Sequence, residues 1–255
     1  MPKVVGMIPA RYASTRLPGK VLLSLGGKPM IQWVFERSRS ASVLDEVLVA
    51  TDDRRVADVV KGFGGTAVLT SPDCSSGTER LAEAVQLPGS PAEDSDIVVN
   101  IQGDQPFIDP VMIEEGVRPL LDDPELPMAT LMHPIQRQDD LADPNVVKVV
   151  VDRAGNALYF SRSLLPYPQK EIPHQVYEHV GLYVYRKEFL VGLANMEPTL
   201  LEQVEALEQL RVLEHGYKLR CVETRCEDNE FSGFSVDTEN DLRRGEAMLR
   251  ERRLA

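Results

Sequence analysis

The sequence predicts an α/β protein built on a doubly wound, mostly parallel sheet. Two observations lead to this fold class. Short apolar runs rich in valine and isoleucine alternate with helical patterns through the first half of the chain. One of these runs, Asp96–Ile101, is almost continuously apolar, as expected of a parallel strand that is covered on both faces. Strands and helices that alternate in this order form a parallel sheet with crossover helices.

The first half of the chain divides into strand and helix segments with signals at their ends. Proline at position 29 suits a first helical turn, Gly62 suits a helix end, and Ser75 and Ser76 suit a helix start. The strands are expected at Val4–Ile8, Glu46–Ala50, Thr66–Leu69 and Asp96–Ile101. The helices are expected at Pro29–Ser40, Arg54–Gly62, Gly77–Gln86, and from Asp109-Pro110 to Leu121.

The second half is less regular. A long helix is expected at Leu200–His215, closed by Gly216, and its apolar stripe is expected to face the core. That stripe comprises Leu200, Leu201, Val204, Leu207 and Leu210. A charged helix is expected at Glu239–Arg252, and a proline-rich loop at Pro166–His174. The strands are expected at Met128–Met132, Val146–Asp152, Leu182–Tyr185 and Lys218–Val222.

Composition excludes several classes of protein. With 28 basic and 40 acidic residues, the net charge of −12 argues against a nucleic-acid coat protein or a binder of anionic membranes. The sequence has no run of eighteen apolar residues and no signal-peptide pattern, so no spanning helix is expected. Three scattered cysteines are too few for a disulfide scaffold or a closed zinc site. We therefore expect a cytoplasmic, reducing location.

The loop after the first strand is the first candidate for a binding site. It runs from Pro9 to Lys20 and contains the cations Arg11, Arg16 and Lys20, separated by small residues. Ligands of open α/β sheets bind at the carboxyl ends of strands, and arginine and lysine bind phosphate oxygens. The loop therefore indicates a phosphate site, with a solvated basic loop as the alternative. It is not a Walker motif, because Val21 follows Lys20.

Two acidic positions suggest a metal site. Asp104 follows the buried strand and lies beside Gly103, where a carboxylate can hold a divalent cation against a phosphate. Asp237 lies in a second loop, just before the terminal helix. The alternatives are a turn-stabilising role for Asp104 and a helix-capping role for Asp237 or Thr238.

Other motifs are weaker. Ser75 to Arg80 offers hydroxyl groups, backbone N–H groups and one cation at a helix start, which suits a polar ligand or an ordinary cap. Gly62 to Ala67 fits a Gly-x-Gly-x-x-Ala pattern, but it follows a helix, so a helix-terminating turn is expected. Glu208, Gln209 and Arg211 could face a cleft. The histidines show no metal-ligand spacing, and the motifs of serine hydrolases and zincins are absent.

Motifs spread over nearly the whole chain resemble those of the 3-deoxy-manno-octulosonate (Kdo) cytidylyltransferases. They run in order from the first loop to the terminal helix. They comprise Ile8–Lys20, Gly27–Ile31, Val49–Asp52, Ser76–Arg80, Asn100–Asp104, Val147–Val149, Ala157–Arg162, Leu207–Arg211 and Val236–Thr238.

The resemblance implies a Rossmann-like nucleotidyltransferase fold, with a mostly parallel central sheet and a smaller β-rich portion for dimerisation and sugar binding. Residues 1–255 would form one domain, with a smaller lobe or insertion at about 130–200. It implies Mg²⁺-dependent transfer of CMP from CTP to the anomeric hydroxyl of Kdo, with release of pyrophosphate, for lipopolysaccharide synthesis. The implied partners are CTP, the acid sugar and a second copy of the chain.

The resemblance also implies a role for each matching residue. Arg11, Arg16 and Lys20 would hold the CTP phosphates. Asp104 and Asp237 would ligate Mg²⁺, and these five residues would be the catalytic set. The base and ribose would be surrounded by Ala10, Thr51, Asp52, Ser76 and Gly77. The sugar would be faced by Arg80, Gln102, His179, Tyr183, Glu208 and Gln209, with Arg80 as the partner of the sugar carboxylate.

One position departs from the family pattern: Gln105 stands where many members have glutamate. The alternative substrates are 8-amino-Kdo and another acid sugar such as a sialic acid. A binding module without catalysis would tolerate loss of Asp104 and Asp237, and both are present. A nicotinamide-dependent oxidoreductase would require glycines where Pro9-Ala10-Arg11 stands.

Overall fold

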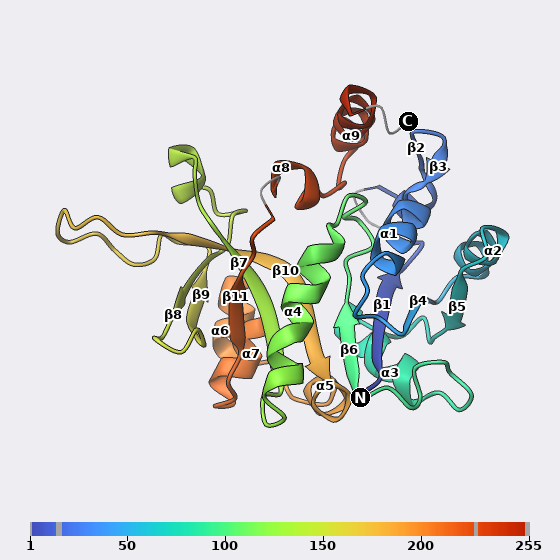
Figure 1. Ribbon diagram of the computed structural model, residues 1–255, viewed down its shortest axis with the longest axis horizontal. Coiled ribbons are helices and arrows are strands. Elements are labelled where there is room, and N and C mark those ends of the chain that lie inside the picture. The colour runs from blue at the N-terminus through green and yellow to red at the C-terminus, as the bar shows by residue number, and fades with distance from the viewer. Residues whose placement is uncertain (1, 14–16, 227–228, 253–255) are drawn as a thin grey trace. The chain divides into compact units, whose positions relative to one another are not determined.

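The computed structural model describes residues 2–13, 17–226 and 229–252 and divides the chain into two compact units (Figure 1). The first unit comprises residues 1–114 together with 226–255, and the second comprises residues 115–225. The second unit therefore begins earlier and ends later than the lobe expected at about 130–200. It is longer because the helix before that lobe and the strand after it also belong to it.

A four-stranded parallel sheet forms the centre of the first unit. The order is β6–β1–β4–β5, and β1 is flanked on both sides by parallel neighbours. All four strands were expected from their apolar runs. Their bounds are Val4–Ala10 (β1), Glu46–Thr51 (β4), Thr66–Leu69 (β5) and Ile97–Asn100 (β6). A two-stranded ribbon of Ser24–Leu25 (β2) and Lys28–Pro29 (β3) was not expected.

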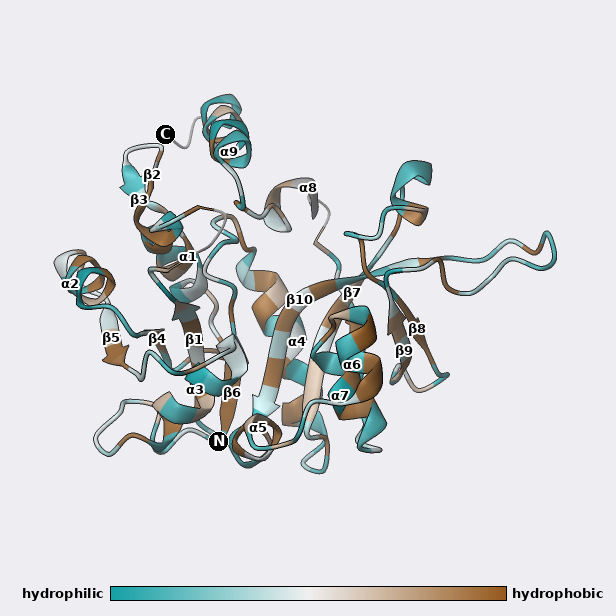
Figure 2. Cartoon of the chain, turned by 180° about the vertical axis from the view of Figure 1, so that it is seen from behind, coloured by the Kyte–Doolittle hydropathy of each residue, from teal (hydrophilic) through white to brown (hydrophobic). Residues whose placement is uncertain are grey.

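Helices cover both faces of this sheet. Helix α1 (Met30–Arg39) and helix α3 (Gly77–Gln86) lie on opposite faces (Figures 1 and 2). The chain builds outward from β1 to β5 and then returns to β6, and right-handed crossovers require that return to use the other face. Helix α2 (Arg54–Gly62) is capped at its N-terminus by Asp53, whose carboxylate accepts a hydrogen bond from the Arg55 N–H group.

The C-terminal segment packs against the loop that follows β6. Phe107 stacks on Phe231, with ring centroids 4.3 Å apart, and on Phe234, at 5.8 Å. Phe231 belongs to α8 (Asn229–Ser232), and α9 (Glu239–Glu251) closes the segment. The Val236 N–H group donates a hydrogen bond of 2.9 Å to the Asp104 carbonyl oxygen. These contacts join the two sequence segments of the first unit.

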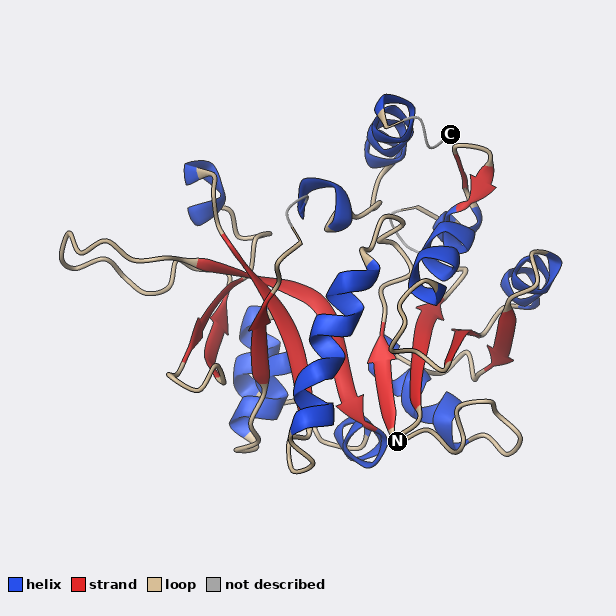
Figure 3. Cartoon of the chain, viewed as in Figure 1, coloured by secondary structure: helices blue, strands red, loops and turns tan. Residues whose placement is uncertain are grey.

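The second unit contains a mixed sheet (Figure 3). Strand β10 (Tyr177–Arg186) lies antiparallel to β7 (Met128–Pro134) and to β8 (Lys148–Val151), and β11 (Arg220–Glu223) lies parallel to β7. Strand β9 (Ala157–Ser161) pairs with β8. The helices of this unit are α4 (Pro110–Asp122), which begins in the first unit, α5 (Lys187–Ala194), α6 (Leu200–Glu205) and α7 (Gln209–Glu214), with a 3₁₀ turn at Gln138–Leu141 (η2). A second 3₁₀ turn, Lys20–Leu22 (η1), belongs to the first unit.

The expectation of one helix over Leu200–His215 was wrong. The chain breaks at Ala206, whose φ angle of 52° ends α6 before α7 begins. Contacts with the β9 region accompany the break. The Glu205 carbonyl oxygen, which would accept from the Gln209 N–H group in a continuous helix, accepts from Arg162 Nε, and the Glu205 carboxylate accepts from Ser161 Oγ and the Arg162 N–H group. The expected apolar stripe is therefore divided. Leu207 and Leu210 are buried, whereas Leu200 and Val204 are 71% and 73% exposed.

The turn after α2 forms as expected. Gly64 has a φ angle of 82°, and Gly65 N–H donates to the Val60 carbonyl oxygen. Within the described residues, none of the helices combines the length and the apolar composition needed to cross a bilayer.

Candidate active site

The first unit contains a cavity of about 270 Å³ at the carboxyl ends of β1 and β6 and the N-terminus of α3. Open α/β sheets bind ligands at this edge. The cavity brings together seven residues that were predicted for nucleotide, metal or sugar binding. Its lining comprises Pro9, Arg11, Lys20, Val21, Cys74, Ser75, Ser76, Gly77, Arg80, Gln102, Gly103 and Asp104.

The loop after β1 folds back to bring Lys20 into this cavity. The Gly19 N–H group donates to the Tyr12 carbonyl oxygen at 2.9 Å. Gly19 has a φ angle of 67°, and a Cβ atom there would lie 3.0 Å from the Tyr12 ring. The backbone at this position thus requires glycine. Arg11 is exposed and lines the cavity. Arg16, the third predicted cation, lies outside the described residues.

The Lys20 ammonium group lies between two carboxylates. Its Nζ atom is 2.6 Å from Asp104 Oδ2 and 3.1 Å from Asp237 Oδ1. The three side chains are 15%, 28% and 31% exposed, respectively, so the charges are partly shielded from water. Asp104 and Asp237 are distant in sequence, and the fold brings both to one cation, as a shared site requires.

Backbone contacts that do not involve Lys20 fix the position of each carboxylate. A Cβ atom on Gly103 would lie 3.0 Å from the Pro9 carbonyl oxygen, so glycine allows the loop before Asp104 to approach β1. Asp237 follows Val236, which is buried and bonded to the Asp104 backbone. Thr238 caps α9 by accepting from the Asp241 N–H group, so the capping role belongs to Thr238 and the Asp237 carboxylate faces Lys20.

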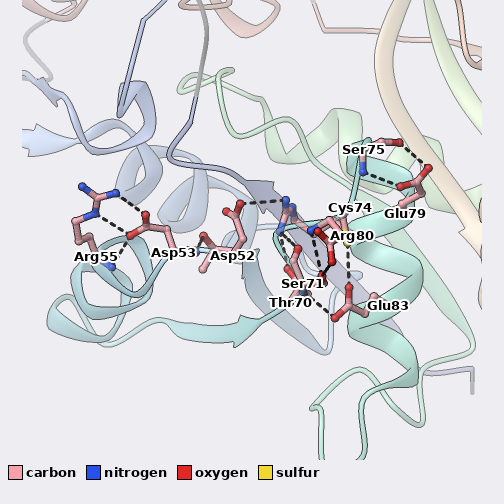
Figure 4. A network of polar contacts seen from close by, with 12 residues as sticks. Asp52, Asp53, Arg55, Thr70, Ser71, Cys74, Ser75, Glu79, Arg80 and Glu83 are labelled. Atoms are coloured by element: carbon pink, nitrogen blue, oxygen red, sulfur yellow. Dashed lines mark hydrogen bonds and ion pairs between the residues drawn. The ribbon is translucent and has the colours of Figure 1, made fainter.

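Arg80 lies in a buried polar network beside the cavity (Figure 4). Its Nη1 atom donates to Thr70 Oγ1 at 2.6 Å and to the Ser71 carbonyl oxygen at 3.3 Å. Its Nη2 atom is 3.6 Å from Asp52 Oδ2, and the residue is 3% exposed. The network therefore connects Arg80 with Asp52, a residue predicted to surround the nucleotide.

The remaining nucleotide residues differ in position. Ser76 and Gly77 line the cavity, and Ser76 Oγ also accepts from the Glu79 N–H group as the cap of α3. Ala10 and Thr51 are buried and do not line it. Cys74 lines it, although sequence analysis did not select this residue. Burial and the neighbouring Glu83 raise the Cys74 pKa to about 11, which keeps the thiol protonated.

Gln102 lines the cavity, and the remaining predicted sugar residues lie in the second unit, on β10 and α7 and just before α7. Tyr183 donates a hydrogen bond of 3.2 Å to Gln209 Oε1, and its ring lies 5.3 Å from that of His179. Among the described residues, Gln209 Nε2 has no hydrogen-bond partner although Gln209 is 4% exposed. Burial raises the pKa of Tyr183 well above its ordinary value, and Glu208 adds to this shift. The unit thus presents neutral donors.

His179 is held by residues that sequence analysis missed. Its Nε2 atom is 2.9 Å from Thr130 Oγ1, and its ring meets Phe160 edge-on at 5.1 Å. Thr130 also lies 2.8 Å from the Leu182 carbonyl oxygen, so its hydroxyl donates there and accepts from the imidazole. Burial lowers the His179 pKa to about 3. Thr130 is flanked by apolar residues in β7, so the sequence gave no indication that its hydroxyl contacts His179.

The two carboxylates fit a divalent cation that arrives with a phosphate. Within the described part of the chain, no group of three or more His, Cys, Asp or Glu residues could hold a metal alone. Mg²⁺ in nucleotide enzymes takes one or two protein carboxylates and completes its shell with phosphates and water. Asp104 and Asp237, which already share one cation, are such a pair.

A family model described as cytidylyltransferase matches residues 5–223. The chain belongs to this family. The chain is 48% identical to a 3-deoxy-manno-octulosonate cytidylyltransferase of Syntrophotalea carbinolica, covering 97% of this chain and 98% of the relative. It is 50% identical to the enzyme of the same name from Geobacter metallireducens, covering 94% and 95%, respectively. These relatives place it among the Kdo cytidylyltransferases.

Solved structures agree with the observed fold. A CMP:2-keto-3-deoxy-manno-octonic acid synthetase complexed with CTP matches with a TM-score of 0.90 and 43% identity, over 98% of this chain and 99% of that one. A Leptospira borgpetersenii cytidylyltransferase matches with a TM-score of 0.64 at 17% identity, over 98% of this chain and 88% of that one. The second likeness concerns the fold alone. The cytidylyltransferase is thus an α/β nucleotidyltransferase, as expected.

Arg80→Ala should destabilise the cytidylyltransferase by about 1–3 kcal/mol, because it leaves buried oxygen atoms without their donors. Urea denaturation of the purified variant measures this change. Arg55→Ala is the matched control, since Arg55 pairs with Asp53 at the surface, and it should change stability little. Unchanged stability in Arg80→Ala, together with a higher KM for the sugar alone, would contradict the structural role. It would support Arg80 as the partner of the sugar carboxylate.

His179 should make the protein less stable in mild acid. Its folded pKa of about 3 lies below the ordinary 6.5, so only the unfolded chain takes up this proton as pH falls below 6.5. The contribution of neutral His179 to the free energy of unfolding is fully present above pH 6.5. It decreases on acidification, by about 1.4 kcal/mol per pH unit at most. Urea denaturation at pH 7 and pH 5 should show a smaller loss for His179→Gln. Equal losses in both proteins would contradict this assignment.

Proposed function

We propose that this cytidylyltransferase transfers CMP from CTP to the anomeric hydroxyl of Kdo and releases pyrophosphate, for lipopolysaccharide synthesis. The observation that supports the chemistry best is the meeting of Lys20, Asp104 and Asp237 at a strand-end cavity. Relatives of nearly equal length with the Kdo cytidylyltransferase name support the choice of sugar.

The nucleotide lies in the cavity of the first unit. Arg11 and Lys20 approach it from the β1 loop and hold the phosphates, together with Arg16. Ser76 and Gly77 contact the base and ribose from the start of α3, and Ala10, Thr51 and Asp52 support that wall. A triphosphate needs several cations in a chain of net charge −12, and this loop provides them in a short stretch of sequence.

The reaction is an in-line attack of the sugar hydroxyl on the α-phosphorus. The new P–O bond forms as the bond to the pyrophosphate oxygen breaks, and negative charge accumulates on the equatorial and leaving oxygens. Lys20 and the arginines stabilise this charge, and binding of both substrates in one geometry lowers the entropic cost. Asp104 and Asp237 would hold Mg²⁺, which would neutralise phosphate charge and make the attacking hydroxyl more acidic.

The sugar is recognised largely by neutral groups. Gln209 offers a buried amide without a partner among the described residues, and Tyr183 and His179 remain uncharged. Such groups suit the hydroxyls of an acid sugar, because each buried polar atom requires a hydrogen-bond partner. Glu208, the residue before α7, is also proposed to contact the sugar.

The second unit also supports a homodimer. Large apolar side chains are exposed on β9, on α6 and on the long loop between β9 and β10. Figure 1 labels both elements. The exposed side chains are Leu158 (61%), Leu200 (71%), Val204 (73%), Tyr167 (79%) and Ile172 (63%). A contiguous exposed apolar patch favours a protein interface, and we propose that these residues contribute to one. A cytoplasmic location is consistent with three cysteines that form no disulfide.

Wild-type protein should release pyrophosphate from CTP with Mg²⁺ and Kdo, measured in parallel with 8-amino-Kdo and N-acetylneuraminate. Asp104→Asn and Asp237→Asn should each lower kcat at least a hundredfold, because each removes a charge from the site. Asp241→Asn, in the neighbouring helix cap, is the control for fold and should retain activity. Release with another sugar alone would keep the mechanism and change the substrate, and silence with all three would contradict the proposal.

The wild-type protein should have a solution mass of twice the 28.4 kDa chain mass in sedimentation equilibrium. The double variant Leu158→Glu/Val204→Glu should raise the dimer dissociation constant at least tenfold, because it would bury four carboxylates per dimer. Leu69→Glu, on an exposed strand position of the first unit, is the matched control. A wild-type monomer, or a double variant that still dimerises equally well, would contradict this assignment.

A further inference from the structure

Lys20 interacts with the same two carboxylates that are proposed to hold the metal ion. The contacts to Asp104 and Asp237 measure 2.6 Å and 3.1 Å, and Nζ is also 3.4 Å from the Val236 carbonyl oxygen. An ammonium group and a divalent cation that share these oxygens repel each other strongly at such distances. The two cations therefore compete for one position.

We propose that Lys20 excludes free divalent metal from the nucleotide-free enzyme and admits it only together with CTP. This inference rests on the proposed function. A triphosphate offers Lys20 alternative oxygens in the same cavity, which Lys20 lines together with Arg11. Movement of the ammonium group onto the phosphate leaves two carboxylates of net charge −2, which then favour a divalent cation.

The local backbone permits this exchange to be made by the side chain alone. Lys20 starts a short 3₁₀ turn whose position is fixed by the Gly19 N–H bond to Tyr12. Asp104 and Asp237 are joined through the Val236 N–H bond, which does not involve Lys20. Rotation of the flexible lysine stem therefore changes the partner of the ammonium group and leaves both carboxylates in place.

The coupling is reciprocal by thermodynamic necessity. If CTP raises the affinity for the metal by displacing Lys20, the metal raises the affinity for CTP by the same factor. The enzyme would thus discriminate against metal-free nucleotide. It would also avoid holding a metal that lacks a phosphate partner.

The test is Mn²⁺ binding to the nucleotide-free protein, measured by electron paramagnetic resonance. Wild-type protein should bind Mn²⁺ at least tenfold more weakly than Lys20→Met, because methionine keeps the stem and removes the ammonium charge. A non-hydrolysable CTP analogue should raise the Mn²⁺ affinity of the wild-type protein at least tenfold, toward the affinity of Lys20→Met. Lys28→Met, which removes the same charge from a surface pair with Glu36, should leave Mn²⁺ affinity unchanged.

Two further measurements keep the outcomes distinct. Lys20→Met/Asp237→Asn should lose the gained Mn²⁺ site, which locates it at the carboxylates. Equal Mn²⁺ affinity in wild type and Lys20→Met would overturn the inference, as would an equal gain in Lys28→Met. Either of these results with normal pyrophosphate release by wild-type protein would leave the proposed function intact, whereas absence of that release would contradict the function itself.

Discussion

The backbone hydrogen bond between Val236 and Asp104 is the contact on which the arrangement of the site depends. It joins the loop after β6 to a segment more than a hundred residues later in the chain, and the stacked rings of Phe107, Phe231 and Phe234 join the same two segments. Arginine side chains lie over two of these rings, and Arg252 is 4.2 Å from the Phe231 centroid. The shared position of the two carboxylates is therefore a product of core packing.

Electrostatics separates this site from the rest of the molecule. The chain is strongly acidic, but its first loop concentrates basic residues beside the strand ends. In the second unit, burial lowers the pKa of His179 and raises the pKa of Tyr183, so both side chains are uncharged. One unit therefore offers ionic interactions suited to phosphate, and the other offers hydrogen bonds suited to hydroxyl groups.

Local sequence signals predicted the first unit well. Arg54–Gly62, Thr66–Leu69 and Gly77–Gln86 form with the expected bounds, because caps and apolar runs there agree with the tertiary packing. Long-range contacts explain the errors. The segment Leu200–His215 has helical periodicity throughout, but it is divided near Glu205, which accepts hydrogen bonds from the β9 region. No residue close to Glu205 in the sequence indicates these contacts. Strand β9 was not predicted, because its residues were identified only as part of a family motif.

The site was predictable to a similar degree. Strand-end position and residue type selected Lys20 and Asp104, and residue type also made Asp237, Glu208 and Gln209 candidates. The family resemblance assigned their roles and added His179 and Tyr183. Position along the chain could not reveal that Lys20 contacts both carboxylates, or that Thr130 and Phe160 surround His179. The buried network of Arg80 likewise depends on Thr70 and Asp52, which the sheet brings near it.

The division of the first unit into two sequence segments also affects its assembly on the ribosome. Chains are made from the N-terminus, and domains generally fold as they emerge. Here the parallel sheet emerges early, whereas Phe231, Phe234 and Asp237 are synthesised only after the entire second unit. A nascent chain thus contains the loop after β1 and Asp104 long before Asp237 has been synthesised. On the proposed function, catalysis consequently depends on a residue that is made only after the second unit.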